Sequence, residues 1–453
     1  MNNPEFLRNL WLEFSLHRLV AVPLGLGLTL WMASITGGQA AGMGYMAAIL
    51  FVAFTLVGGT KLTAEGLFRE VDERTWDWQR LSGLSPWSMT WGKLLGGPIF
   101  TWYAGLWCLL AFALSRWSEL GPEKTWQWLA LMVVGAVLSH ALAFLFALLV
   151  TRRQREPAHR RRTLGTIILA LLMGIYTYPL AVLLKKGFHW YDQYVPFLDF
   201  VLGSVVVLAV WAILGGYRLI REELQYRDTP WVWLTFLGFA AIYAAGFVPG
   251  GEDSQAGRLW VVFALMLSLT WITALSEPKD PSTWKRLFAA LATRSTGRII
   301  EHLPCWFLTY LTLAGVTLGL MMSPLSHWQL DLGHGMETHW ELGIFLFVTR
   351  DLLLLLLLSL GQGAARWRSE IATLAYLMIL YGVVPGILHQ LPNLSFLTAL
   401  FWPLPHKNLA WLILPPLAQS AGLVAVLIFS WRRRANQPVG TVRQKTRMSQ
   451  TPP

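Results

Sequence analysis

Ionisable side chains inside apolar segments are the first residues that suggest chemistry. Arg350 and Asp351 lie near the middle of the apolar run Leu342–Gln362, and His140 lies in another such run. If these runs cross a membrane, an unpaired charge costs several kcal/mol. Successive helix positions point roughly 100° apart, so Arg350 and Asp351 need not pair with each other, and His140 is a candidate partner. Two roles stay open for the three residues: polar contacts that hold helices together, or a transport path.

A second group of reactive side chains lies in the polar segment SHWQLDLGHGMETHWE. Its three histidines and three acidic residues are types that hydrolytic zinc sites use. They are His327, Asp331, His334, Glu337, His339 and Glu341. The spacing fits no compact pattern such as H-E-x-x-H. An ordinary polar loop outside the membrane is therefore the preferred interpretation, and no metal site is predicted.

The Gly92-Lys93 pair in TWGKLLG suggests a phosphate-binding loop, but the surrounding residues do not fit one. Such a loop needs several glycines before the Lys and a Ser or Thr after it, to ligate magnesium. Here Leu94 follows Lys93, and Thr90 lies on the wrong side. The full G-x-x-x-x-G-K-[ST] pattern occurs nowhere in the chain. We therefore do not expect this chain to be an enzyme that hydrolyses ATP.

The composition indicates which elements carry these residues. The 453 residues are 55% hydrophobic and only 13% charged, whereas a soluble protein has about 25% charged residues. The apolar residues fall in runs of roughly 18 to 25, long enough to cross a bilayer core of about 30 Å as helices. The sequence therefore predicts an all-α polytopic membrane protein.

The apolar runs predict about twelve transmembrane helices in two parallel six-helix halves, 17–220 and 221–430. An amphipathic surface helix (1–16) precedes them, and a basic, disordered cytoplasmic tail (431–453) follows. Because six is an even number, each half starts and ends on the same side. The predicted spans are 17–35, 43–61, 97–115, 126–150, 163–184, 197–216, 231–249, 259–275, 305–322, 342–361, 371–388 and 409–430.

The basic residues predict the orientation of these spans. With both termini in the cytoplasm, only six of the 36 Lys and Arg residues fall in outside loops, and Arg350 lies within a span. This asymmetry follows the positive-inside rule. The net charge of +11 is thus attributed to orientation and anionic lipids, not to nucleic acid. The prediction is a multi-pass protein of the cell (cytoplasmic or inner) membrane.

One loop between predicted spans has an unusual composition. ERTWDWQRLSGLSPWSMTWGKLLG (Glu73–Gly96) begins with charges, continues with aromatic residues, breaks at SGLSP and resumes as the helix that enters the third span. This pattern predicts a short helix at the membrane surface, with its apolar face on the bundle and its polar edge toward the cytosol.

This loop resembles that of permeases of exporter-class ATP-binding-cassette transporters. Between their second and third spans, these permeases typically carry an acidic residue, Gly-Thr, a bulky-Glu-bulky run, Thr-Pro-Leu-Ser and Gly-Lys-Leu. Thr75-Trp76-Asp77, Ser82–Ser85 and Gly92–Leu95 take the matching positions. Two residues depart from the pattern, because Arg74 replaces a Gly and Gly83 replaces the Pro. The motif covers some 25 residues, and the six-span plan extends the likeness over the first half.

The resemblance implies a function for the loop. In that family the loop is a coupling helix that fits a groove of a separate ATPase subunit, so ATP and magnesium belong to the partner and no cofactor is expected on this chain. The implied contact residues are Glu73, Thr75, Asp77, Ser82, Gly83, Leu84 and Ser85. A predicted repeat extends the plan to the second half: KDPSTWKRLFAALATRS shares Thr-Trp, Arg-Leu and Ser with DERTWDWQRLSGLSPWS. Loops 62–96 and 276–304 would then both couple to the ATPase.

Two other function classes stay open. A twelve-helix ion-coupled secondary transporter needs carboxylates inside the membrane in both halves, and apart from Asp351 very few are found. A membrane enzyme would need several acids or metal ligands at one surface, and only the segment 327–341 offers them. The sequence does not reveal the substrate, although the apolar, aromatic bundle slightly favours a lipid-like or amphipathic cargo.

Overall fold

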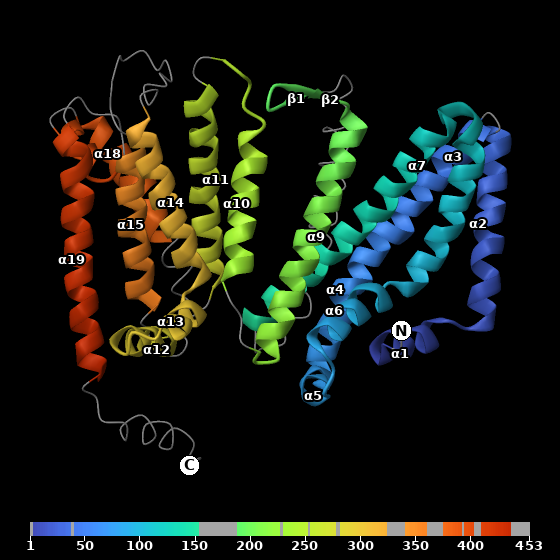
Figure 1. Ribbon diagram of the computed structural model, residues 1–453, viewed down its shortest axis with the longest axis horizontal. Helices are drawn as coiled ribbons and strands as arrows, with labels where there is room; N and C mark the ends of the chain where they lie inside the picture. The colour runs from blue at the N-terminus through green and yellow to red at the C-terminus, as the bar shows by residue number, and fades with distance from the viewer. Residues whose placement is uncertain are drawn as a thin grey trace. The chain divides into compact units, whose positions relative to one another are not determined.

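The computed structural model describes residues 3–37, 40–153, 188–226, 230–251, 254–277, 281–323, 340–359, 375–391, 394–402 and 409–435. Almost all of these residues are helical, which confirms the predicted all-α class (Figure 1). One short antiparallel hairpin interrupts the helices, formed by β1 (Phe188–Trp190) and β2 (Gln193–Val195). The chain forms two compact units, unit 1 (Met1–Asp228) and unit 2 (Thr229–Pro453). The predicted boundary between the halves, at 220–221, falls in the last turn of the helix Phe197–Glu223, within unit 1.

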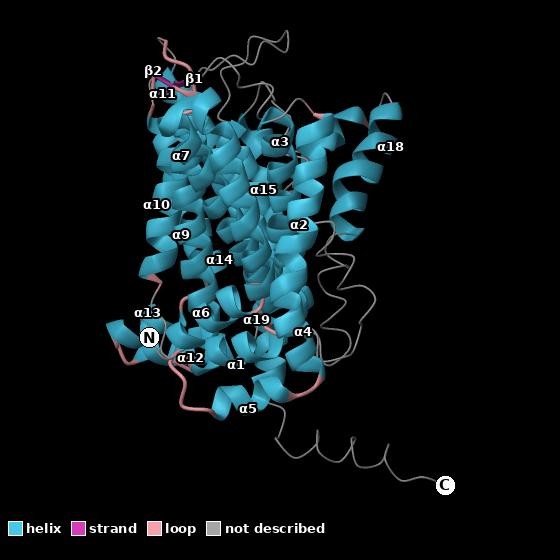
Figure 2. Ribbon diagram, turned by 90° about the vertical axis from the view of Figure 1, so that its right-hand side faces the viewer, coloured by secondary structure: helices cyan, strands magenta, loops and turns pink. Residues whose placement is uncertain are grey.

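Unit 1 consists of the hairpin and nine helical elements. They are α1 (Pro4–Glu13), α2 (Leu16–Thr36), α3 (Ala40–Phe51), the π-helix η1 (Val52–Gly58), α4 (Gly59–Asp72), α5 (Thr75–Leu81), α6 (Pro86–Gly96), α7 (Ile99–Arg153) and α9 (Phe197–Glu223), counted within the described residues. Both views place α1 and α5 at the end of this unit opposite to the hairpin (Figures 1 and 2). By the predicted topology, that end is the cytoplasmic one.

Unit 2 is helical throughout its described residues. Its elements are α10 (Trp231–Ala245), α11 (Ser254–Ser276), α12 (Pro281–Ala292), α13 (Thr296–His302), α14 (Cys305–Met322), α15 (Trp340–Ser359), the π-helix η2 (Ile379–Val383), α18 (Val384–Gln390), the 3-10 helix η3 (Ser395–Leu400) and α19 (Leu409–Ala435). Helix α19 continues beyond the predicted start of the tail at residue 431.

Within the described residues, eight helices are long and apolar enough to cross a membrane. One of them, Ile99–Thr151, contains two predicted spans, because Gly121 has a non-helical φ of 78° ahead of Pro122. The rings of Trp102 and His140 lie 5.5 Å apart, whereas a straight helix would separate them by about 57 Å. Helix α7 is therefore a helical hairpin that crosses twice.

Some of the remaining predicted spans match helices that are shorter than a full span, and one lies outside the described residues. Two of the matching helices are short, Trp231–Ala245 and Ala375–Gln390. The predicted span 163–184 lies outside the described residues. The chain is thus a multi-pass membrane protein, and the count of twelve spans stays a prediction.

Residue spacing explains how the helices of unit 1 pack. In α4 the buried side chains Leu67 and Phe68 follow the buried Ala64 by three and four residues, so the three share one helix face. They belong to the same core as Phe144 of α7 and Ile220 of α9. A Cβ added at Gly216 would lie 3.0 Å from a ring carbon of Phe144, so this glycine permits the close contact of α9 with α7.

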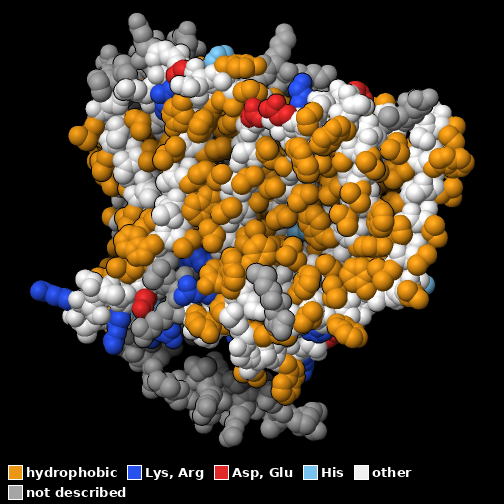
Figure 3. Space-filling view, turned by 45° about the vertical axis from the view of Figure 1, so that its right-hand side comes forward, with side chains coloured by type: hydrophobic (Ala, Val, Ile, Leu, Met, Phe, Trp, Pro, Cys, Tyr) orange, Lys and Arg blue, Asp and Glu red, His pale blue; other side chains and the backbone are white. Residues whose placement is uncertain are grey.

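The outer surface matches a membrane environment. Large hydrophobic side chains are exposed along the spanning helices, for example Leu24 and Trp31 of α2. Figure 3 shows hydrophobic side chains over the middle of one face, while Lys, Arg, Asp and Glu side chains gather toward its two ends. Exposed apolar area of this extent is compatible with lipid and not with water.

Candidate docking loop

The segment between α4 and α6 forms a short surface helix and a turn, as the sequence predicts. Helix α4 ends at Asp72, α5 covers Thr75–Leu81, and α6 begins at Pro86. Of the seven predicted contact residues, six are exposed: Glu73, Thr75, Asp77, Ser82, Gly83 and Ser85. Leu84 is half-buried and packs against the core of unit 1. The loop therefore presents nearly all of the predicted docking residues to the outside.

Backbone geometry at the start of α5 explains one departure from the family pattern. Arg74 has φ 59° and ψ 15°, in the left-handed region that glycine adopts most easily. The family has Gly at this position. The chain therefore makes the turn that a Gly would make, although Arg bears a steric cost there. Thr75 continues the turn, since its Oγ1 donates to the Glu70 carbonyl at 3.1 Å.

The turn between α5 and α6 is held by its two serines. The Ser82 hydroxyl donates to the Gln79 carbonyl at 2.6 Å, at the end of α5. The Ser85 hydroxyl accepts from the Ser88 N–H at 3.2 Å and so caps the start of α6. A Cβ added at Gly83 would meet nothing within 4 Å. The turn is thus defined by hydrogen bonds without the Pro that the family carries.

The two faces of α5 differ strongly in burial. Trp76 is buried against the core, whereas Trp78 is 76% exposed and Leu81 is 81% exposed. At a membrane surface, exposed apolar side chains of this kind can contact lipid headgroups or another protein. The outward face of α5 is therefore a candidate interaction surface.

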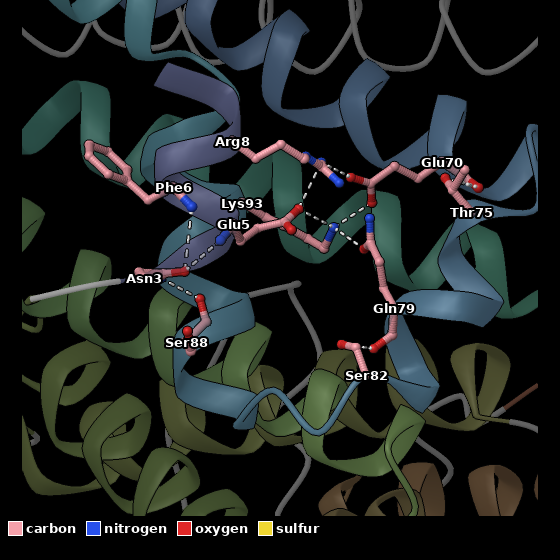
Figure 4. A network of polar contacts seen from close by, with 10 residues as sticks. All are labelled: Asn3, Glu5, Phe6, Arg8, Glu70, Thr75, Gln79, Ser82, Ser88 and Lys93. Atoms are coloured by element: carbon pink, nitrogen blue, oxygen red, sulfur yellow. Dashed lines mark hydrogen bonds and ion pairs between the residues drawn. The ribbon is translucent and has the colours of Figure 1, made fainter. Parts of the chain in front are cut away.

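Lys93 forms the centre of the polar network that holds the loop in place (Figure 4). Its side chain is only 7% exposed. The ammonium group donates to Glu5 Oε1 at 3.3 Å, to Gln79 Oε1 at 2.7 Å and to Glu70 Oε2. It also lies 5.2 Å from the ring centroid of Trp76. One buried cation thus joins α1, α4, α5 and α6.

Helix α1 is fixed to the loop by further contacts. Arg8 Nη2 lies 2.9 Å from Glu5 Oε1 and 3.2 Å from Glu70 Oε1. Asn3 caps α1 and also donates from Nδ2 to the Ser88 carbonyl at 2.7 Å. The surface helix predicted for residues 1–16 is therefore attached directly to the loop.

Two glycines allow α1 to approach α6 this closely. A Cβ at Gly92 would lie 2.6 Å from the Glu5 Cβ, and a Cβ at Gly96 would lie 2.6 Å from Asn9 Nδ2. Small residues four positions apart on one helix face permit such close packing. The Gly92-Lys93 pair thus serves helix packing and a buried ion network.

The opposite side of the loop rests on α9. Arg80 donates from Nε and Nη2 to the Glu223 carbonyl, at 3.1 and 2.8 Å, at the end of that helix. Near the same end, the ring centroids of Trp87 and Tyr217 lie 5.0 Å apart. These contacts give the Glu223 carbonyl at the helix end two hydrogen bonds and connect the loop to α9.

The second predicted loop also contains two helices, α12 and α13. Arg294 between them has a positive φ of 51°, and Arg74 before α5 likewise has a positive φ of 59°. Trp284, aligned with Trp76 in the predicted repeat, packs near Trp306, with ring centroids 6.0 Å apart. Glu277 accepts hydrogen bonds from the Cys305 and Trp306 N–H groups at 3.1 and 3.0 Å. Aromatic packing and a helix cap therefore fix this loop to its own unit.

Arg350 and Asp351 pair with each other, although helical geometry alone does not require it. Arg350 Nε donates to Asp351 Oδ1 at 2.8 Å, and both side chains are buried. Although their Cα–Cβ bonds diverge, the long Arg side chain reaches back to its neighbour. Tyr381 donates to Asp351 Oδ2 at 2.6 Å, and Arg350 Nη1 donates to Gln419 Oε1 at 2.9 Å. The pair thus joins α15, η2 and α19.

His140 has a partner within unit 1. Its Nε2 lies 2.8 Å from the Thr55 carbonyl in the π-helix η1. A Cβ at Gly59 would lie 2.3 Å from that nitrogen, so the absence of a side chain there makes room for the ring. The Arg350–Asp351 pair and His140 therefore each have hydrogen-bond partners on other helices of their own unit.

The structure describes only part of the His-rich outside segment. Residues 324–339 lie outside the described residues, and with them His327, Asp331, His334, Glu337 and His339. Glu341 is buried in the first turn of α15. In the described part of the chain, no three His, Cys, Asp or Glu side chains are grouped to hold a metal ion.

Comparisons of this chain with protein-family models, with curated proteins and with solved structures found no match.

Proposed function

We propose that this chain is the membrane-spanning permease of an ATP-driven transporter of the exporter class, and that a separate ATPase subunit docks on α5 and the turn at Ser82–Ser85. One observation carries the proposal. The residues that resemble a coupling helix form an exposed helix and turn, braced on their inner side by the Lys93 network and by Arg80.

The bracing suits the transmission of force. A loop that moves spanning helices must be stiff relative to those helices. Lys93 and Arg80 attach α5 to α1, α4, α6 and α9 through charge-assisted hydrogen bonds, which are the stronger kind. When the ATPase closes around ATP, it would displace α5. The movement of α5 would also displace α4, which is part of a spanning helix, and α6, which leads into the spanning helix α7. The bundle would then switch between inward- and outward-facing states.

The rest of the proposal follows the predicted topology. The chain would lie in the cytoplasmic or inner membrane with both termini in the cytoplasm. Helix α1 would lie at the lipid surface, since its Trp11 is strongly exposed. The loop formed by α12 and α13 would be a second ATPase site, and the cargo would be lipid-like or amphipathic.

Cross-linking tests the proposal. Ser82→Cys or Ser85→Cys in the full chain, in native membranes, would carry a photoactivatable cross-linker, and radioactive azido-ATP would label nucleotide-binding proteins. We expect an adduct that carries the ATP label. Tyr194→Cys, exposed at the opposite end of unit 1, and the wild-type chain with its own Cys108 and Cys305 serve as controls. If neither serine position gives a labelled adduct, the proposed function is wrong.

A second candidate is an ion-coupled secondary transporter, favoured by one observation, the carboxylate of Asp351 deep in unit 2. Transport by reconstituted permease alone, driven by an ion gradient without any ATPase and lost in Asp351→Asn, would support this alternative.

A further inference from the structure

Helix α12 has an apolar flank that the rest of unit 2 leaves exposed. Leu287 and Ala290 are buried, whereas Phe288 is 55% exposed and Leu291 is 48% exposed. Phe288 and Leu291 are three residues apart, so they lie on the same side of the helix. The buried face fixes α12 to its unit, and the apolar flank made by Phe288 and Leu291 stays open to the surroundings.

This flank lies beside the end of a spanning helix. The ring centroids of Phe288 and of Trp431 in α19 are 6.4 Å apart, where α12 lies next to the C-terminal end of α19 (Figure 1). The apolar stretch Ala410–Arg432 of α19 ends at this level, and Phe429 is 66% exposed. A tryptophan at the end of a lipid-exposed apolar helix is typical of the membrane–water interface. The contact therefore places the flank at the depth of lipid headgroups.

Exposed cations border the flank on both elements. Lys285 lies three residues before Phe288 and is thus its neighbour on the helix surface. Arg432 directly follows Trp431, and both cations are exposed. The other exposed cations of the loop are Arg286, Arg294 and Arg298. Positive charge therefore gathers where an apolar surface reaches the interface.

Acidic side chains do not balance this charge. Residues 281–302 contain one acidic residue, Glu301 in α13, and residues 431–453 contain none. Lys279 and Asp280, which precede α12, offset each other. The loop and the adjoining end of α19 are thus strongly cationic.

The first loop has a different charge balance. Its helix α5 also exposes an aromatic side chain, Trp78. There, however, Asp77 Oδ1 lies 3.8 Å from Arg80 Nη1, and Glu73 is adjacent in sequence to Arg74. Opposite charges thus accompany the exposed apolar surface of α5, whereas cations alone border the flank of α12.

We propose that the flank of α12 binds an anionic phospholipid of the cytoplasmic leaflet. The phosphate group lies between Lys285 and Arg432, and an acyl chain packs on Phe288, Leu291 and Trp431. Cations near a membrane surface attract anionic headgroups, and the charge-assisted hydrogen bonds of Lys and Arg to phosphate are strong.

The surroundings of the flank favour lipid over an acidic protein. The apolar surface continues from α12 along α19, where Ile428 and Phe429 are exposed. A soluble partner that covered the flank would have to displace the bilayer from this continuous surface. The inference does not depend on the proposed ATPase, which would dock on the turn at Arg294 and on α13.

Photolabelling in vesicles without any ATPase tests the inference. A photoreactive phenylalanine analogue replaces Phe288 in one full-length variant and Phe54, which is 45% exposed on η1 of unit 1, in another. The vesicles contain phosphatidylcholine and phosphatidylglycerol with the same acyl chains, and each lipid is radioactive in turn. We expect the ratio of phosphatidylglycerol to phosphatidylcholine adducts to be at least about fivefold higher at position 288, since one cation near an anionic headgroup contributes about that factor.

Charge variants show whether the two cations cause the preference. Lys285→Gln with Arg432→Gln should lower the ratio at position 288 by about fivefold or more. The same variant should leave the ratio at position 54 unchanged, which also shows that the chain is folded. Lys61→Gln with Arg74→Gln is the matched control, because it removes two cations that lie near Glu65 and Glu73. It should change the ratio at position 288 by less than about twofold.

Three results would overturn the inference. The first is an equal ratio at positions 288 and 54, and the second is a ratio at position 288 that Lys285→Gln with Arg432→Gln leaves unchanged. The third is lipid labelling at position 54 with none at position 288, since the flank would then not face lipid. None of these results bears on the docking of an ATPase at α5, so the two proposals fail separately.

Discussion

Replacement of Lys93 by Met should release α1 and α5 from the bundle while leaving the spanning helices folded. Met matches the length and apolar stem of Lys but removes the ammonium group. Glu5 and Glu70, whose side chains are 6% and 15% exposed, would then lie close together without the shared cation. Loss of one partner of a buried ion pair costs about 3–5 kcal/mol.

The free-energy loss expected for Lys93→Met lies at the lower end of that range. Arg8 still lies beside both carboxylates, at 2.9 Å from Glu5 and 3.2 Å from Glu70, but it is 45% exposed and its contribution is screened by solvent. We therefore expect a loss of about 3 kcal/mol in the free energy of local opening. Since 1.4 kcal/mol is a factor of ten, this corresponds to amide exchange in α1 and α5 that is about 150-fold faster.

Hydrogen exchange measured by mass spectrometry in detergent checks this value. The matched control is Lys61→Met, because Lys61 is 50% exposed and lies 3.9 Å from Glu65 on the same helix. Such a surface pair contributes about 0.3–0.5 kcal/mol, so exchange should change by less than about threefold. Equal exchange in Lys93→Met and Lys61→Met would refute the reasoning that the buried network holds the loop.

Three further predictions concern the membrane pair and the loop. Arg350→Met should lower the Tm in detergent, because it leaves the Asp351 carboxylate buried without its cation, at a cost of about 3–5 kcal/mol. The double variant Arg350→Met with Asp351→Asn should recover most of the lost stability. A double variant no more stable than Arg350→Met would contradict this prediction. Gly92→Ala should weaken the packing of α1 on α6 by about 1–3 kcal/mol, because the new methyl group would overlap the Glu5 Cβ. Trypsin should then cleave faster after Arg8. The control Gly83→Ala, which meets no atom within 4 Å, should leave the cleavage rate unchanged. Arg74→Gly should stabilise α5 by about 0.5–1 kcal/mol, because Gly adopts the left-handed backbone conformation without strain. The amides of α5 should then exchange about two- to fivefold more slowly. Faster exchange would show that Arg74 is not strained.

Local patterns predict the parts of this fold that depend on neighbours in the chain. The break at SGLSP, the surface helix before it and the helix after it follow from serine caps and a Pro at the first helical position. Trp76 and Trp78 lie two residues apart, so helical spacing places them on opposite faces of α5. Which of the two is buried depends on tertiary contacts with the core of unit 1.

The network around Lys93 is not predictable in that way. Glu5 and Lys93 are separated by 88 residues, and no periodic pattern connects positions so far apart. One local signal was available, the small-residue spacing of Gly92 and Gly96 on one helix face, which marks a closely packed neighbour. That signal indicates contact with some helix but does not identify α1. The Arg350–Asp351 pair was missed for another reason, since helical geometry gives the direction of the Cβ atoms and not the path of a long side chain.

The first loop is fixed to four helices of its unit by Lys93 and Arg80. Donors fixed on specific acceptors lose energy steeply as their geometry departs from optimum, so α5 cannot shift alone without breaking these contacts. If an ATPase subunit docks on α5 as proposed, the displacement would therefore reach α1, α4, α6 and α9 together.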